Sequence, residues 1–401
     1  MKKLNLIIKI IILSFISITC RDYVTNVEPL VTATEDSNLN NQSQVQFLIN
    51  GVETNFAYTL GQVDVCAGGL SDAFFFDNNV PAATYPTFED IDLGNIHLAN
   101  ASVADAYNSV GQLRYYSDDL IRRIDLISFS DTTLKNSALF TGYFFGGYAR
   151  YLYATYFGLN PTQGGSPINN GPFIESNDMY NLAINDFKES LKYINDALMI
   201  KTVNSMLAKS YLYKADYDSA ASYAAQGLIN GDTPFQAFHN SNQLNYWYGD
   251  AGQGRKQFVA DFRFINYIDA DPNEAGRIKI GSIMGNNNVM YYYQLVYPNL
   301  DSPQKVITWQ ENDLMRAELI LRGAASGDAL GLVNEVRVSH GIAPLSSVDL
   351  DIIYIERDKE LFASGNRLAD ERRFNKWHLA PGTWQYLPVT ERERNGNPNI
   401  D

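Results

Sequence analysis

The sequence has only two cysteines among its 401 residues, Cys20 and Cys66. Because Cys20 lies at the end of a signal-like segment, we expect no disulfide bond within the fold, which must rely on a hydrophobic core. Basic residues are also few: 31 Lys and Arg against 45 Asp and Glu give a net charge of −14, which argues against nucleic acid as a partner. The four histidines are scattered, without the spacing of a zinc site: His97, His239, His340 and His378.

No sequence motif for catalysis is present. The chain contains neither a P-loop nor a Gly-x-Ser-x-Gly segment. Acidic residues are so abundant that neighbours such as Asp269 and Asp271 are expected by chance, and a glycosidase pair needs a set separation in space. We therefore predict a binding protein with no enzymatic activity, cofactor or metal ion, and keep a surface glycan-processing enzyme as the less favoured alternative.

The N-terminus has the pattern of a bacterial secretory signal. Lys2 and Lys3 precede an apolar run over residues 4–15, which is too short to span a bilayer core of about 30 Å. Cys20 follows at the expected cleavage point, so we predict that residues 1–19 are removed and that Cys20 carries a lipid. An ordinary cleaved signal is the alternative. Residues 20–43 are polar, which predicts a flexible tether.

Apolar residues recur with helical spacing through the middle of the chain. The pattern predicts amphipathic helices over residues 101–127 and 134–157, and a further helix from about residue 177. A glycine costs a helix roughly 1 kcal/mol relative to alanine, so glycines inside the second helix indicate a close approach of neighbouring helices. These glycines are Gly142, Gly146 and Gly147.

One segment follows the spacing of a tetratricopeptide repeat, with small and aromatic residues where two helices would cross: Leu207, Ala208, Tyr211, Ala220 and Ala224. A second helical pair is predicted from Trp309 to about residue 341. Such pairs cannot bury their apolar faces alone, so several must stack. We therefore predict a mainly α, tetratricopeptide-like scaffold with little β structure, as one domain over residues 44–401 with long irregular loops at about 64–98 and 232–308. A plain helical bundle is the alternative.

The C-terminal part of the chain carries an ordered set of short motifs. They are Glu356-Arg357-Asp358-Lys359-Glu360-Leu361, Gly365-x-Arg367-x-x-Asp370-x-Arg372-Arg373-Phe374, Tyr386-Leu387-Pro388-Val389 and Asn397-Pro398-Asn399. This set resembles the C-terminal signature of the SusD/RagB family. The predicted helices before it also resemble that family's successive helices, so the resemblance covers most of the chain.

The resemblance implies a function and a location. Members of this family are lipid-anchored nutrient-binding proteins of the outer membrane of Bacteroidetes-type bacteria, each paired with a SusC-like TonB-dependent transporter. The chain is therefore expected at the outer membrane, on the cell surface, where it would capture an oligosaccharide and pass it to such a transporter. A peptide or another oligomer is the alternative cargo.

Aromatic residues among amides and acids mark the candidate ligand site, because sugar rings stack on aromatic planes while polar side chains bind their hydroxyl groups. We predict ligand contacts from three stretches: Asn245, Tyr246, Trp247 and Tyr248; Phe75, Asp77, Asn78 and Tyr85; and Tyr292. The alternative is that these aromatic residues pack irregular segments onto the core. We favour that alternative for residues 74–76 and 291–293.

Overall fold

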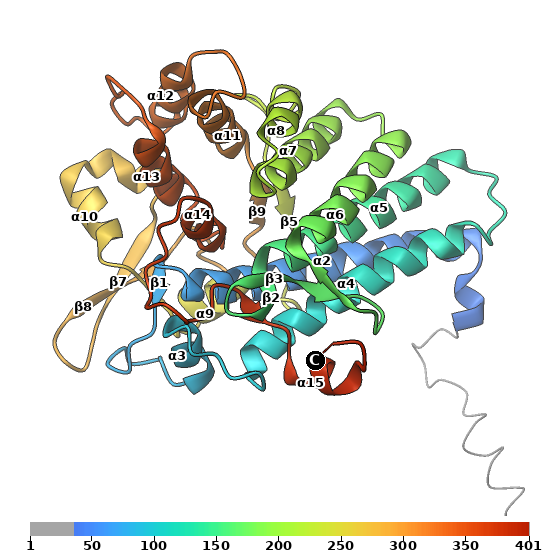
Figure 1. The fold of residues 1–401 in the computed structure, drawn as a ribbon, viewed down its shortest axis with the longest axis horizontal. Coiled ribbons are helices and arrows are strands. Elements are labelled where there is room, and N and C mark those ends of the chain that lie inside the picture. The colour runs from blue at the N-terminus through green and yellow to red at the C-terminus, as the bar shows by residue number, and fades with distance from the viewer. Residues whose placement is uncertain (1–35, 401) are drawn as a thin grey trace, which may run out of the picture.

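The computed structural model describes residues 36–400 of the chain (Figure 1). The predicted signal peptide, Cys20 and the first part of the tether lie outside the described residues. Within them, helices form most of the structure and the strands are short, which confirms the mainly α prediction. No helix in this part of the chain is both long enough and apolar enough to cross a membrane.

Most of the longer helices pack against a helix that is close to them along the chain. The longer ones are α2 (Val45–Leu70), α4 (Ala101–Ile124), α5 (Thr132–Tyr156), α6 (Ser176–Ser190), α7 (Ala197–Tyr213), α8 (Tyr217–Ala224), α11 (Trp309–Leu321), α12 (Ala329–Ser339) and α13 (Leu350–Glu360). The shorter ones are α3 (Pro86–Asp92), α9 (Tyr246–Ala251), α10 (Arg263–Ala270), α14 (Arg367–Arg373) and α15 (Glu391–Gly396). Short 3-10 turns are η1 (Asp36–Leu39), η2 (Gln42–Gln44), η3 (Leu191–Tyr193) and η4 (Pro272–Gly276).

Polar side chains define where several of these helices begin. An Asn, Asp or Thr just before the helix accepts a hydrogen bond from a backbone N–H of the first turn, which would otherwise lack a partner. Asn100 caps α4 through the Val103 N–H at 3.1 Å, and Asp196 caps α7 through the Met199 N–H at 2.8 Å. These boundaries are therefore encoded in the local sequence.

Helix α5 packs against both α4 and α6 (Figure 1). A β-carbon added at Gly142 would come within 2.6 Å of Ile121 on α4, and one at Gly147 within 3.1 Å of the Ala183 carbonyl on α6. The close helix approach predicted from these glycines is confirmed. A side chain at Gly142 would require Ile121 to shift, and one at Gly147 would be tight against α6.

The predicted tetratricopeptide-like pair is helices α7 and α8. The small residues expected at the crossing, Ala208, Ala220 and Ala224, are fully buried or nearly so. Tyr211 stacks on Tyr223 at 5.6 Å across the pair. Helices α11 and α12 form the second predicted pair, and α11 packs against α8. Both predicted helical pairs are therefore present.

Three small sheets accompany the helices. The first joins β1 (Phe74–Phe75), β6 (Val259–Ala260), β8 (Met290–Gln294) and β7 (Ile280–Met284) in that order, with all pairs antiparallel. The second has the order β10 (Leu387–Pro388), β2 (Phe157–Asn160), β3 (Gln163–Pro167) and β4 (Phe173–Glu175), with β10 parallel to β2. The third pairs β5 (Phe235–Ala237) with β9 (Gln304–Ile307).

The two predicted irregular segments are more ordered than expected. Residues 64–70 continue helix α2, and α3 lies within the segment predicted as a loop at 64–98. Residues 232–308 contain α9, α10 and the strands β5 to β9. These strands have two to five residues each, which is too short for an alternating apolar pattern to become visible in the sequence.

Candidate functional site

The first sheet brings together aromatic residues from three separate segments. They are Phe75 in β1, Phe262 just after β6, and Tyr291 in β8. The ring centres of Phe75 and Phe262 are 5.6 Å apart. The Tyr291 ring lies 6.2 Å from that of Phe75 and 5.9 Å from that of Phe262. Phe262 keeps 38 % of its surface exposed, so part of its ring is open to a ligand. We call these three residues the aromatic cluster.

The predicted residue Tyr292 lies beside this cluster. Successive side chains of a strand point to opposite faces, so Tyr292 and its neighbour Tyr291 point away from each other. Tyr292 meets Phe262 edge-on at 6.4 Å and is half-buried. Tyr292 therefore borders the cluster with its ring at a right angle to that of Phe262.

An amide-rich rim borders the aromatic cluster. The loop after β1 and the turn between β7 and β8 are joined by a hydrogen bond of 2.8 Å from the Asn286 N–H to the Asn79 carbonyl. This bond gathers exposed asparagines from both segments: Asn78, Asn286, Asn287 and Asn288. An amide side chain both donates and accepts hydrogen bonds, as a sugar hydroxyl does. The predicted residue Asn78 therefore lies at the rim, and its side chain is exposed.

The predicted residue Asp77 is tied to the protein. Its Oδ2 accepts a hydrogen bond of 2.6 Å from the Tyr291 hydroxyl, and its Oδ1 accepts one of 2.7 Å from the Asn79 N–H. Burial alone would raise the pKa of Asp77, but these hydrogen bonds outweigh it and hold the pKa below its ordinary value. Asp77 thus stays charged while it fixes the loop and the Tyr291 ring.

Tyr85 is presented at the surface by a buried glutamine. The Gln257 Oε1 accepts hydrogen bonds from the N–H groups of Thr84 and Tyr85 at 2.9 Å and 3.0 Å, and its Nε2 donates to the Ala82 carbonyl at 2.8 Å. Tyr85 itself is 40 % exposed, and the Arg255 guanidinium lies 4.9 Å from its ring centre. An exposed ring on a fixed backbone is suited to stacking.

The structure overturns the stacking role predicted for Trp247. Its side chain is 0 % exposed and packs on Phe74 at 5.0 Å. Its tip lies so near α2 that a β-carbon added at Gly68 would come within 2.6 Å of it. The short helix α9 directs this ring into the core, where a ligand cannot reach it.

The other residues of that stretch are also largely committed to the protein. Asn245 is 0 % exposed; it caps α9 by accepting from the Tyr248 N–H at 3.3 Å, and its amide donates to the Ser302 carbonyl at 2.9 Å. The ligand role predicted for Asn245 is therefore wrong. Tyr246 and Tyr248 are half-buried, and Tyr246 packs edge-on against Tyr58 of α2 at 5.5 Å.

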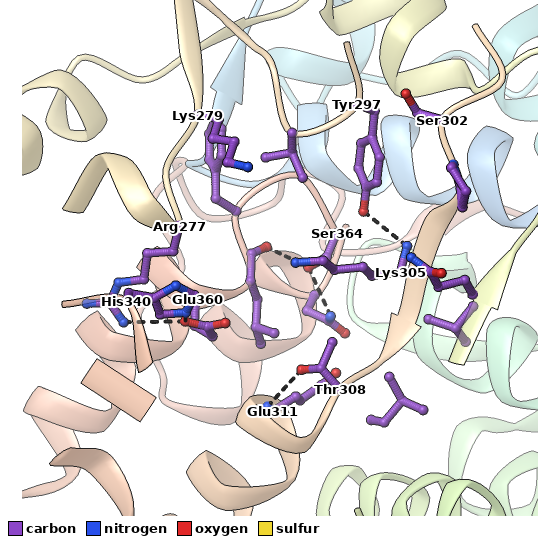
Figure 2. Close-up of a pocket in the computed structure, with 18 of the residues that line it drawn as sticks. Arg277, Lys279, Tyr297, Ser302, Lys305, Thr308, Glu311, His340, Glu360 and Ser364 are labelled. Carbon is purple, nitrogen blue, oxygen red and sulfur yellow. Dashed lines mark hydrogen bonds and ion pairs between the residues drawn. The ribbon is translucent and has the colours of Figure 1, made fainter. Parts of the chain in front are cut away.

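A separate pocket of about 260 Å³ lies between β9, α13 and the segment that leads into β7 (Figure 2). His340 Nε2 is 2.9 Å from Glu360 Oε2 at one end of it. Lys279 and Lys305, both exposed, line it and form no ion pair with any residue of the described part. Its lining comes from segments far apart in the chain, so sequence reasoning gave no sign of it.

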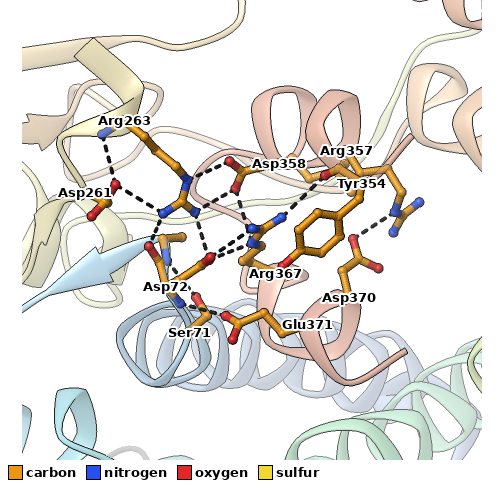
Figure 3. Close-up of polar contacts among 12 residues, drawn as sticks. Ser71, Asp72, Asp261, Arg263, Tyr354, Arg357, Asp358, Arg367, Asp370 and Glu371 are labelled. Atoms are coloured by element: carbon orange, nitrogen blue, oxygen red, sulfur yellow. Dashed lines mark hydrogen bonds and ion pairs between the residues drawn. The ribbon is translucent and has the colours of Figure 1, made fainter. Parts of the chain in front are cut away.

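The C-terminal motifs form a network of ion pairs behind the first sheet (Figure 3). Arg263, at the start of α10, binds Asp358 with two hydrogen bonds of 2.8 and 2.9 Å, and Arg367 binds Asp72. Arg357, which is 0 % exposed, contacts Asp370 at 2.8 Å. These motif residues join α13 and α14 to α10 and to the loop that leads from α2 into β1. They thus contact α10, which directly follows Phe262, and the segment just before β1, which carries Phe75.

No protein-family model and no curated protein matches the sequence. Solved structures do match. A SusD superfamily protein from Bacteroides thetaiotaomicron has a TM-score of 0.75 at 16 % identity, over 90 % of this chain and 99 % of its own. One from Bacteroides vulgatus has a TM-score of 0.71 at 16 % identity, over 90 % and 98 %. Surface glycan-binding protein A from Bacteroides thetaiotaomicron, in complex with laminarihexaose, has a TM-score of 0.67 at 13 % identity, over 90 % and 98 %. The chain therefore has the fold of the SusD superfamily.

Proposed function

We propose that this chain is a SusD/RagB-type surface lipoprotein that binds a nutrient oligosaccharide and passes it to a SusC-like TonB-dependent transporter. The observation that carries the proposal is the aromatic cluster with its amide-rich rim, built on a SusD-like fold. Solved proteins with this fold include a surface glycan-binding protein and a laminarin-binding SusD-like protein. The mechanism is binding without chemical conversion of the ligand.

The chemistry of the site suits a neutral sugar. The exposed part of the Phe262 ring offers a plane for the apolar face of a sugar ring, and the exposed asparagines of the rim match the hydroxyl groups at the sugar's edge. Asp77, held by Tyr291 and Asn79, keeps the rim in place. Tyr85 supplies a further exposed ring on the same loop.

A titration tests the binding part of the proposal. Calorimetry of residues 21–401 with pooled neutral oligosaccharides should give heat with at least one pool, and pooled peptides should give none. Phe262→Ala should weaken the binding by roughly tenfold, since one aromatic stacking contact is removed. Phe238→Ala is the matched control, because Phe238 is 72 % exposed and lies outside the cluster.

The outcomes separate the alternatives. Heat from the peptide pool alone would replace the sugar with a peptide as cargo. An unchanged affinity in Phe262→Ala would remove the aromatic cluster from the site. If chromatography detected a product released from any oligosaccharide, the chain would be an enzyme and the proposal would be overturned.

The anchor and the transporter partner need their own test. The full-length protein should fractionate with outer membranes, whereas Cys20→Ser should appear in the soluble fraction, because the lipid supplies the attachment. Purification of the full-length protein from detergent-solubilised outer membranes should bring down a TonB-dependent transporter. Its absence from the purified material would contradict the proposed handover.

A further inference from the structure

A second group of amides lies away from the first sheet, along helix α4. Two hollows, of about 280 and 410 Å³, both include Asn108 and Gln112 of α4. The two hollows therefore adjoin at these two side chains of α4. Charged residues line them as well, and their formal charges cancel: Asp105, Arg114, Arg392 and Glu393. The two adjoining hollows also contain six amides, and we call them together the amide groove: Asn55, Asn108, Gln112, Asn169, Asn170 and Gln243.

Helix α2 forms one wall of the groove. The Thr59 hydroxyl donates to the Ser109 carbonyl of α4 at 3.1 Å, which fixes the two helices side by side. One turn further along, Asn55 and Gln112 face each other at 3.5 Å. Tyr58 lies on the same wall, where the ring of Tyr246 meets it edge-on at 5.5 Å. An aromatic pair therefore stands at one end of the row of amides.

The opposite wall is held by the last motif of the chain. Asn169 and Asn170 adopt left-handed backbone conformations, with φ of 54° and 55°. The Asn399 side chain donates to the Asn170 carbonyl at 2.7 Å, and the Asn397 side chain donates to the Gly171 carbonyl at 2.9 Å. The Asn-Pro-Asn motif thus fixes the loop that turns these two asparagines toward the groove.

Several of the groove's polar groups are not used by the fold. The side chains of Asn108 and Gln243 form no hydrogen bond with any residue between 36 and 400, and the contact between Asn55 and Gln112 is at the limit of a hydrogen bond. Asn169 is engaged, since its Oδ1 accepts from Arg114 at 2.7 Å. The free amides can therefore bind a ligand without breaking the protein's own contacts.

A solvated helix face would look different. The outer face of a surface helix usually carries charged residues, but the 26 residues of α2 include no Lys or Arg, and Glu53 and Asp64 are their only acids. Asp64 is buried, so Glu53 alone is an exposed charge on this helix. On the α2 wall, amides and aromatic residues therefore occupy places where a purely solvated face would carry charges, whereas the α4 wall adds Asp105.

We infer that the amide groove is a second glycan-binding site, for a neutral sugar chain. An amide can both donate and accept a hydrogen bond, as a sugar hydroxyl does, and a lining whose formal charges cancel suits a ligand without net charge. A second site lets the protein hold a long polysaccharide at two places, so that the effective concentration of the chain at the aromatic cluster rises. This inference rests on the proposed function.

Native electrophoresis through gels that contain laminarin, starch or galactomannan tests the inference. Residues 21–401 are compared as wild type, Asn55→Ala/Gln112→Ala, Phe262→Ala and the combination of all three substitutions. Asn181→Ala/Asn266→Ala is the matched control, because both residues are exposed amides on helices, outside the groove. Circular dichroism establishes that each variant is folded.

The wild type should be retarded by at least one polysaccharide. Loss of two amide contacts should weaken that retention by roughly fivefold, while the matched control should behave as wild type. The triple variant should lose retention altogether. Greater loss in Asn55→Ala/Gln112→Ala than in Phe262→Ala would also support the groove, although it would contradict the aromatic cluster as the main site.

Equal retention of the wild type and Asn55→Ala/Gln112→Ala would overturn the inference and leave the proposed function standing. The amide groove would then be a candidate surface for binding a protein partner instead of a glycan. A wild type that no polysaccharide retards would contradict the proposed function, and the inference with it.

Discussion

Arg367 and Asp72 lie 295 positions apart and form a two-point ion pair, with Arg367 Nε 2.6 Å from Asp72 Oδ1 and Nη2 2.9 Å from Oδ2. Asp72 also contacts Arg263 at 2.8 Å, and its N–H donates to Glu371 at 2.7 Å. Asp72 lies just before β1, which carries Phe75 and leads into the loop with Asp77 and Asn78. The C-terminal motif therefore reaches back to hold the base of the candidate site.

Arg367→Ala should destabilise the fold. It leaves the half-buried Asp72 carboxylate with one partner fewer, and removal of one member of a largely buried pair costs about 3 kcal/mol. Urea unfolding followed by circular dichroism measures the loss. Because the same pair fixes the loop, sugar affinity of the folded variant should also fall.

Arg122→Ala provides the comparison. Its side chain is 57 % exposed and pairs with Asp119 on the surface of α4, where an ion pair contributes little. This variant should unfold at nearly the urea concentration of the wild type. Equal losses in the two variants would show that burial does not govern the contribution of the Arg367 pair.

Asp370 should make stability depend on pH. Burial alone would raise its pKa, but Arg357 and Arg373 outweigh it and lower the pKa to about 2. In the unfolded chain an Asp has a pKa of about 4. Because the folded value is the lower one, the carboxylate's contribution is present above about pH 4 and is lost as the pH falls toward about 2.

Asp370→Asn should therefore lower the free energy of unfolding at neutral pH by about 2 kcal/mol or more, since it also leaves two buried arginines without this partner. The gap to the wild type should narrow as the pH is lowered from about 4 to about 2.5 in a series of urea titrations. Asp351→Asn is the control, because Asp351 has a 74 % exposed side chain. A gap of constant size would contradict the assigned pKa.

Local patterns were sufficient for the helical scaffold. The helix predicted over 101–127 is α4, residues 101–124, because its apolar spacing and its Asn100 cap lie close together in the sequence. Gly142 and Gly147 also signalled the helix contacts around α5. The C-terminal motifs indicated the family resemblance, but their partners could not be predicted, since residues such as Asp72 and Arg263 lie far away along the chain.

The candidate site shows where such patterns fail. Phe262 was missed because it stands alone, and only the pairing of β1, β6 and β8 brings it to Phe75. Trp247 was misassigned because an aromatic run among amides looks the same whether its rings face water or the core. The signal that could have corrected this was the glycine pair Gly68-Gly69 near the end of α2, which leaves room for large side chains.

Trp247→Ala should lower the stability of the protein. It should weaken sugar binding only to the extent that it disturbs the fold. The ring is 0 % exposed, and replacement of a buried tryptophan by alanine costs about 3–5 kcal/mol. Unfolding in urea measures that loss, and calorimetry of the folded variant measures affinity. Trp247→Phe, which refills part of the space, should recover part of the stability. A Trp247→Ala protein with unchanged stability and lost sugar binding would restore Trp247 to the site.

Two glycines of α2 should respond to alanine with opposite signs. At Gly51 a β-carbon would meet no atom within 4 Å, so Gly51→Ala should stabilise the protein by up to about 1 kcal/mol through its better helix propensity. At Gly69 a β-carbon would come within 2.0 Å of the Phe258 ring, which is itself 0 % exposed and cannot move into solvent. Gly69→Ala should therefore destabilise the protein by about 1–3 kcal/mol despite the same gain in helix propensity.

Thermal unfolding of both variants measures these effects: the melting temperature should rise for Gly51→Ala and fall for Gly69→Ala. A rise in both would mean that Phe258 can repack, and that the contact between α2 and the segment before β6 is looser than the structure shows.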